Sequence, residues 1–190
     1  MPRLIPTVLP PLRDCIRHGV RVLLVGINPG VQSSLTGHHF AGPSNRFWRL
    51  LYESGLVPEP ITHVDDRRLP QWGFGITNIV SRPSPGIDTL RREEFVEGRA
   101  TVVRKVLRYR PTIVALVGVT VFRALFPERR GMVSLGLQRE RIGESAIFVL
   151  PNPSGRNAHY SYPQMLGAFK ELGQVAGACE RRRSQRSPPR

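Results

Sequence analysis

Three short polar motifs in the sequence contain asparagines that could act on a polar ligand. Residues 26–30 read G-I-N-P-G, residues 75–78 read G-I-T-N, and residues 152–156 read N-P-S-G-R. The amide of Asn28 does not titrate near neutral pH and cannot be a general base, but its carbonyl oxygen can hold a water molecule. On its own, the first motif is as typical of a tight strand–helix turn or of a phosphate-binding nest of backbone amides.

A glycine-bounded segment, G-H-H-F-A-G-P-S-N-R-F-W, adds an aromatic ring and two histidines. Phe40 lies in a loop, so it is a candidate for stacking on a flat ligand, and a ring plugged into the core is the alternative. The aromatic pair that ends the segment is predicted to belong to the core. His38 and His39 are predicted to be structural or to contact phosphate, because no third ligand is spaced with them as a metal site requires.

The third motif places a long cationic side chain directly after a glycine. Gly155 precedes Arg156 in a polar loop. A flexible loop with a projecting side chain could push into a nucleic-acid duplex. The alternative is a surface arginine that contacts phosphate.

Four apolar runs predict the strands that carry these motifs, and four amphipathic stretches predict helices. Strands are expected at 20–25, 74–80, 112–117 and 146–150, helices at 45–54, 90–108, 119–126 and 162–175, and loops at 31–44 and 56–72. This alternation is typical of a three-layer α/β/α sandwich around a four-stranded, mostly parallel sheet. Ligands bind outside the carboxyl ends of such strands, so the three motifs are predicted to surround one cleft.

The length suits a single folded domain. We expect an N-terminal segment over residues 1–19, a domain over residues 20–179 and a tail over residues 180–190. The tail contains mainly Arg, Ser, Pro and Gln, so it is predicted to be disordered and basic.

Basic residues outnumber acidic residues by two to one. The chain has 28 Lys and Arg against 14 Asp and Glu, a formal net charge of +14, and Lys105 and Lys170 are its only lysines. This excess predicts an acidic partner, and nucleic acid is the commonest one. No apolar run approaches the roughly 20 residues of a membrane helix, and the N-terminus lacks the apolar region of a signal peptide. We therefore expect a cytoplasmic protein with no membrane partner.

The two cysteines argue against several kinds of site. Cys15 and Cys179 lie far apart and outside any C-x-x-C motif. This pattern argues against a disulfide scaffold, a zinc ribbon and an iron–sulfur cluster. We expect a protein with no metal and no cofactor.

Together these motifs resemble those of the mismatch-specific uracil-DNA glycosylases, bacterial relatives of eukaryotic thymine-DNA glycosylase. The resemblance covers roughly residues 20–175, with motifs at 26–30, 37–48, 74–83 and 152–156. It implies a uracil-DNA glycosylase-like fold and a monofunctional DNA-repair hydrolase. Such an enzyme flips uracil, with thymine or other modified pyrimidines as further candidates, out of a G·U-type mismatch in double-stranded DNA. It then hydrolyses the N-glycosidic bond and leaves an abasic site. A monomer at the bacterial nucleoid is expected.

The resemblance also implies roles for individual residues. Asn28 matches the residue that positions the hydrolytic water, and Phe40 matches the aromatic residue that stacks on the flipped base. Ser33 matches a loop residue near C5 of the pyrimidine, and Asn78 matches a position that faces the base. We expect Ile27 to join these base-binding residues.

The same resemblance assigns the third motif to the DNA duplex. Arg156 matches the wedge that fills the space left by the flipped nucleotide. The backbone of Gly155 and Asn157 would face the widowed guanine. Preorganised amides around the pyrimidine carbonyls would stabilise the leaving anion.

Asp88 is a second catalytic candidate. It is the only acid between Asp66 and Glu93, and it follows the second predicted strand on the cleft side. A general base typically contributes ~10²–10⁴-fold to a rate, and asparagine supplies none. The alternative is that Asp88 or Thr89 caps the next helix.

Two competing hypotheses concern the class of protein. A non-catalytic DNA-binding module with a degenerate site would share the charge, but the intact asparagines and Phe40 favour an enzyme. Another uracil-DNA glycosylase family of the same fold is the second. Its iron–sulfur branches need four cysteines, and the classical branch expects aspartate in place of Asn28.

Overall fold

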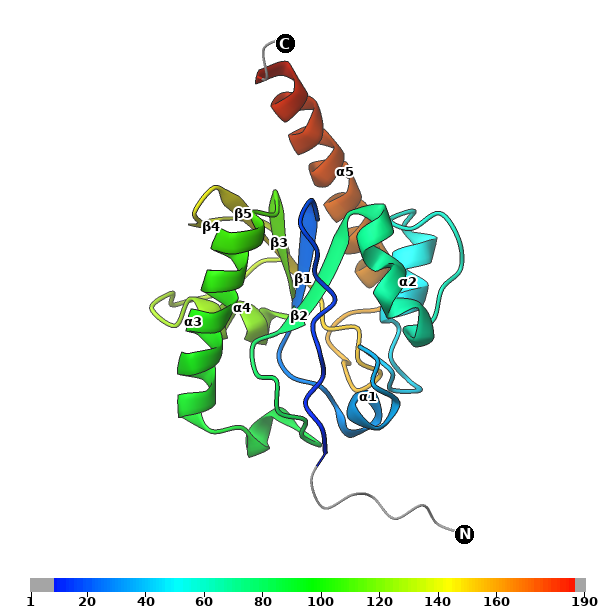
Figure 1. Cartoon of the computed structure of the whole chain (residues 1–190), viewed down its shortest axis with the longest axis vertical. Helices are drawn as coiled ribbons and strands as arrows, with labels where there is room; N and C mark the ends of the chain where they lie inside the picture. Colours follow the sequence, from blue (N-terminus) through cyan, green and yellow to red (C-terminus); the bar gives the residue numbers. More distant parts are fainter. Residues whose placement is uncertain (1–8, 187–190) are drawn as a thin grey trace.

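The computed structural model describes residues 9–186, which form a five-stranded sheet between helices (Figure 1). The strands are β1 (Val22–Gly26), β2 (Phe74–Asn78), β3 (Ile113–Val117), β4 (Gly136–Ile142) and β5 (Ser145–Leu150). Their order in the sheet is β2-β1-β3-β5-β4. Neighbours are parallel except β4, which pairs antiparallel with β5 at the edge. The predicted α/β sandwich is confirmed, with one strand more than expected.

Helices cover both faces of this sheet. They are α1 (Val31–Thr36), α2 (Phe47–Glu53), α3 (Arg92–Tyr109), α4 (Val119–Leu125) and α5 (Tyr162–Arg186), with 3₁₀ helices η1 (His63–Trp72) and η2 (Ile87–Thr89). Figure 1 shows α3 and α4 on one side of the strands and α2 and α5 on the other. Within the described residues, no helix is both long enough and apolar enough to cross a membrane.

The alternation of side chains along β1 explains the three layers. Leu24 belongs to a buried cluster with Phe47 of α2, whereas Leu23 belongs to a second cluster with Val102 of α3. All five residues of β1 are buried. A strand covered on both faces must be apolar throughout, which is why the run was recognisable in the sequence.

The elements that differ from the prediction are polar or short. Strand β4 has alternating burial and a charged centre, Arg139-Glu140-Arg141, as suits an edge strand, and its sequence offers no apolar run. The predicted loop over residues 31–44 contains the six-residue α1, and the predicted loop over residues 56–72 contains η1. Neither helix has the long apolar period on which the prediction depended.

Helix α5 continues to Arg186, so the predicted disordered tail is wrong over residues 180–186. Glu, Arg and Gln have high helix propensity, and no glycine or proline interrupts residues 178–186. The final four residues of that predicted tail lie outside the described residues.

The N-terminal segment is joined to the domain from Pro10 onward. The carbonyl oxygen of Pro10 accepts a hydrogen bond from Ser34 (2.6 Å), and Cys15 exchanges backbone hydrogen bonds with Ile76 of β2 (3.0 and 2.9 Å). Leu12 is 9% exposed. These contacts hold residues 10–15 against the domain beside β2. Residues 1–8 lie outside the described residues.

Candidate active site

A cleft of about 1220 Å³ lies at the carboxyl ends of the parallel strands. Segments that follow β1, β2, β3 and β5 form its wall. It brings together most of the predicted site residues, namely Ile27, Asn28, Ser33, Phe40, Asn78, Arg156 and Asn157. Gly155 and Asp88 do not line it. The topology rule for parallel sheets therefore located the cleft correctly.

Asn28 is held with its amide in one orientation. Its Nδ2 donates to the carbonyl oxygen of Pro29 (3.0 Å) and to Oγ of Ser84 (2.8 Å). The Ser84 hydroxyl in turn donates to the carbonyl oxygen of Gly86 (2.7 Å). Because the hydroxyl proton of Ser84 is donated to Gly86, Ser84 Oγ can only accept a hydrogen bond from Asn28. The atom of the Asn28 amide that contacts Ser84 is therefore the NH₂ nitrogen. The Oδ1 atom of Asn28 is left as an acceptor in the cleft wall.

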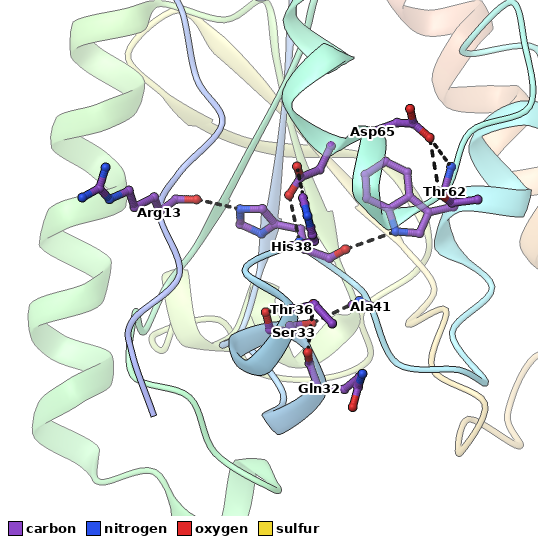
Figure 2. Close-up of polar contacts among 11 residues, drawn as sticks. Arg13, Gln32, Ser33, Thr36, His38, Ala41, Thr62 and Asp65 are labelled. Atoms are coloured by element: carbon purple, nitrogen blue, oxygen red, sulfur yellow. Dashed lines mark hydrogen bonds and ion pairs between the residues drawn. The ribbon is translucent and has the colours of Figure 1, made fainter. Parts of the chain in front are cut away.

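Phe40 adopts a backbone conformation that a bulky side chain rarely takes. Its φ is +50°, in the left-handed region. Its neighbours are both fixed, since the N–H of His39 donates to Asp66 (3.0 Å) and the N–H of Ala41 donates to the Ser33 hydroxyl (3.1 Å; Figure 2). Such strain costs of order 1–3 kcal/mol and persists where the surroundings enforce it, often in ligand sites. Ser33, 5% exposed, thus positions the loop as well as lining the cleft.

The Phe40 ring lies against the core on one side. It stacks on Phe47 with ring centroids 4.0 Å apart and planes inclined by 20°. It is only half-buried and lines the cleft, so both sequence hypotheses for Phe40 describe part of its environment. A ring supported by a second ring is a rigid platform for a flat ligand.

Asn78 ends β2 beside Gly26, which ends β1, and the two are paired in register. A Cβ atom at position 26 would lie 2.5 Å from Oδ1 of Asn78 and 3.6 Å from Cζ of Phe40. Only glycine at position 26 therefore lets the amide and the ring approach each other. Asn78 is 9% exposed and is part of the cleft wall.

The loop over residues 152–157 is organised by its own hydrogen bonds. Nδ2 of Asn157 donates to the carbonyl oxygen of Asn152 (2.7 Å), and the N–H of Arg156 donates to the Ser154 hydroxyl (3.3 Å). Arg156 is exposed at the cleft edge. Its side chain is therefore carried on an ordered turn, which leaves it free to extend.

Gly155 packs against the Phe40 loop, which spans residues 37–46 between α1 and α2. A Cβ atom at position 155 would lie 2.5 Å from Cβ of Ser44, and the N–H of Arg46 donates to the carbonyl oxygen of Pro153 (3.0 Å). The close packing of these two loops therefore requires glycine at position 155, which the sequence did not reveal.

Asp88 lies in η2 with an exposed side chain. The expectation that Asp88 or Thr89 caps the next helix is wrong. Helix α3 begins after Arg91, whose backbone N–H donates to the Glu94 carboxylate (2.9 Å). Asp88 remains a carboxylate next to the cleft mouth, since Ile87 lines the cleft.

The two histidines join the Phe40 loop to other segments of the chain. Nδ1 of His38 contacts the carboxylate of Asp66 (3.0 Å), and Nε2 of His39 contacts the carbonyl oxygen of Arg13 (3.0 Å). The indole N–H of Trp48 donates to the carbonyl oxygen of His39 (3.1 Å). Burial lowers the pKa of His39, so its ring is neutral near pH 7. The structural role expected for these histidines is therefore visible.

Several lining residues were missed by the sequence analysis. Gly118 and Thr120 follow β3, Pro85 follows β2, and Leu12 comes from the N-terminal segment. The first three obey the same topology rule as the predicted residues and could have been found by applying it to every strand. Leu12 precedes all the strands, and no sequence pattern predicts that it lines the cleft.

The cleft contains no carboxylate among the lining residues that the structure describes. Its polar groups are amides, hydroxyls, two histidines, a tyrosine and Arg156. Such a lining can stack a flat ring, satisfy carbonyl and N–H groups, and tolerate developing negative charge on a ligand.

Comparisons with known proteins agree with this geometry. The family model described as "Uracil DNA glycosylase superfamily" matches residues 14–173. A protein of Schizosaccharomyces pombe named "G/U mismatch-specific uracil DNA glycosylase" is 38% identical over 164 residues, which cover 82% of this chain and 50% of the relative. The chain thus spans about half the length of that curated relative.

Proposed function

The chain belongs to the uracil-DNA glycosylase superfamily, and from that premise we propose that it removes uracil from G·U mismatches in double-stranded DNA. The product is an abasic site, formed by hydrolysis of the N-glycosidic bond. The observation that carries the proposal is the fixed amide of Asn28 in one cleft with Phe40 and Asn78. The name of the fission-yeast relative supports the choice of a G·U substrate. Thymine and other modified pyrimidines are further substrate candidates.

The reaction begins by bringing the base into the cleft. A base cannot be attacked within the duplex stack, so the nucleotide must rotate out, at a cost that is lower for a mismatched pair. The flipped pyrimidine stacks on Phe40, a contact worth roughly 1–3 kcal/mol for a base on an aromatic ring. Asn78 offers an amide to the polar edge of the pyrimidine, with Ile27 and Ser33 around it.

Asn28 holds the water that attacks the sugar. Both N–H groups of its amide are bound by the protein, so Oδ1 accepts from the water and orients it. Bond cleavage places positive charge on the sugar and negative charge on the leaving base. The described part of the cleft wall has no carboxylate to oppose that negative charge, and donors such as the Asn78 amide stabilise it.

Arg156 occupies the gap left in the duplex. Its exposed position on the hydrogen-bonded turn suits insertion between neighbouring base pairs. Asn157, at the same edge, faces the guanine that has lost its partner. Gly155 contributes by letting this turn lie close to Ser44, and its backbone is the second candidate contact to that guanine.

Asp88 is the second catalytic candidate. Its carboxylate lies outside the cleft wall, so η2 would have to shift when DNA binds for Asp88 to reach the water.

The same proposal includes a monomer that acts at the nucleoid in the cytoplasm and needs neither metal nor cofactor for the chemistry. Size-exclusion chromatography with light scattering tests the monomer.

The direct test uses labelled oligonucleotides with one uracil. The protein is incubated with G·U duplex, A·U duplex, single-stranded U and a matched G·C duplex, and abasic sites are then cleaved with alkali. We expect strand cleavage at uracil in the G·U duplex and none in the G·C duplex. Binding to the G·U duplex without cleavage would instead identify a non-catalytic DNA-binding module.

A further inference from the structure

Cys15, His39 and Asp66 form a cluster of potential metal ligands, of which His39 directly precedes Phe40 in the chain. One donor atom from each side chain, a sulfur, a nitrogen and an oxygen, lies within 4.8 Å of the other two. They come from the N-terminal segment, the loop after α1, and η1. His39 is 2% exposed and Asp66 is 1% exposed. Because the three residues belong to different segments, no sequence spacing could reveal them as a group.

The ring of His39 is in the state that a metal ligand requires. The carbonyl oxygen of Arg13 can only accept, so Nε2 of His39 carries the proton of the neutral ring. Nδ1 is then the nitrogen with a free lone pair, and no hydrogen bond to it occurs among the described residues. A histidine whose second nitrogen donates to a backbone carbonyl is the usual arrangement in protein metal sites.

The buried carboxylate of Asp66 has only histidine partners among the described residues. Its carboxylate accepts from the N–H of His39 and from Nδ1 of His38, and no Arg or Lys pairs with it among residues 9–186. Buried charges such as this carboxylate are normally paired with an opposite charge or coordinate a metal. Burial and the nearby Asp66 carboxylate raise the pKa of Cys15 to about 12, so the thiol stays protonated.

We propose that Cys15, His39 and Asp66 form a binding site for a divalent cation of the zinc class. Thiolate, imidazole and carboxylate are the ligands that zinc takes in proteins, and a water molecule would complete four-coordination. On binding, the Cys15 S–H bond breaks, its proton leaves to solvent, and a sulfur–metal bond forms. The cation joins the N-terminal segment to η1 and to the residue before Phe40. It stabilises the base-stacking loop and takes no part in bond cleavage.

The test uses the full-length protein, stripped with EDTA, desalted and titrated with Co²⁺. We expect one equivalent to bind, with a thiolate-to-cobalt charge-transfer band and the visible absorption of a four-coordinate site, and we expect Zn²⁺ to remove both and raise Tm. Cys15→Ser should abolish the charge-transfer band and weaken binding by about 100-fold or more, because loss of even an outer-shell partner costs roughly 10–100-fold. Cys179→Ser is the matched control and should keep the band.

A second measurement covers the case in which Cys15→Ser does not fold. The wild-type protein is alkylated in denaturant-free buffer with and without Zn²⁺, and each cysteine is quantified by peptide mass spectrometry. Zn²⁺ should protect Cys15 and leave Cys179 unchanged. Folded wild-type protein without a thiolate band, a band that survives Cys15→Ser, or equal alkylation of Cys15 with and without Zn²⁺ would each overturn the site. None of these results depends on glycosylase activity.

Discussion

The side-chain amide of Asn28 has both of its protons bound by the protein, to Pro29 and Ser84. This leaves one acceptor atom for a water molecule, which is all that a residue without a titrating group can offer. The sequence predicted Asn28 from its motif. It did not predict Ser84, because a serine in a proline-rich loop has no distinctive pattern, and its value arises only from the fold.

Ser84→Ala should slow uracil release by about 5–10-fold, the scale of one lost hydrogen bond worth ~1 kcal/mol. The Asn28 amide would lose one of its two anchors and sample other orientations. Single-turnover rates on a G·U duplex measure the effect. Ser81→Ala, at an exposed position in the same loop, is the matched control and should keep the wild-type rate.

Asp88→Ala separates the remaining roles of that carboxylate. If Asp88 is the second catalytic group, the rate falls by ~10²-fold or more, the usual scale for a general base, and Tm stays unchanged because Glu94 caps α3. Asp88→Asn should behave like Asp88→Ala. Full activity in both variants would remove Asp88 from the site.

At the scale of elements, the cleft depends on loops that contact one another. The turn over residues 152–157 lies against the Phe40 loop, through Gly155 on Ser44 and through the Arg46–Pro153 hydrogen bond. The turn that we propose enters DNA and the loop that we propose receives the base are therefore in direct contact. Sequence patterns predicted both loops but not their contact, because a glycine used for close approach looks like one used for flexibility.

Gly155→Ala tests this contact without straining the backbone, since the φ of Gly155 is not positive. The added methyl group would collide with Ser44 and push the turn away from the Phe40 loop. We expect weaker binding to a G·U duplex, by about tenfold, with a smaller loss on single-stranded DNA. Ser44→Gly in the same chain should restore part of the affinity, and a double variant no better than Gly155→Ala would argue against the contact.

The buried strands were the most predictable elements. The runs over β1 and β3 are apolar because both faces of the sheet are covered. Strand β4 was missed because an edge strand can carry charges, and the end of α5 was missed because a charged sequence suits a solvated helix as well as a disordered tail.

At the scale of the whole molecule, an arginine-rich segment lies at the C-terminal end of α5, far from α1. The chain carries a formal net charge of +14, and the sequence of the last turns of α5 is rich in arginine. Figure 1 shows that the C-terminal end of α5 projects away from the sheet, far from α1. No described residue of α5 lines the cleft.

Removing residues 180–190 should therefore weaken nonspecific DNA binding and leave the single-turnover rate at saturating protein unchanged. Affinity of both forms should fall steeply as salt rises, because arginine–phosphate contacts release counterions, and the truncated form should show the shallower slope. Fluorescence anisotropy across a salt series measures this. Equal slopes, or lost cleavage at saturation, would contradict the assignment.

The central claim is that the fixed amide of Asn28 positions the water that releases uracil. The most direct measurement is the single-turnover rate of uracil release from a G·U duplex by wild-type protein and by Asn28→Ala, at protein concentrations that saturate the DNA. The account predicts that the variant binds the duplex and keeps its Tm within a few degrees but releases uracil at least ~10²-fold more slowly, the scale for loss of one preorganised group at the reacting centre. A variant that releases uracil at the wild-type rate would contradict it.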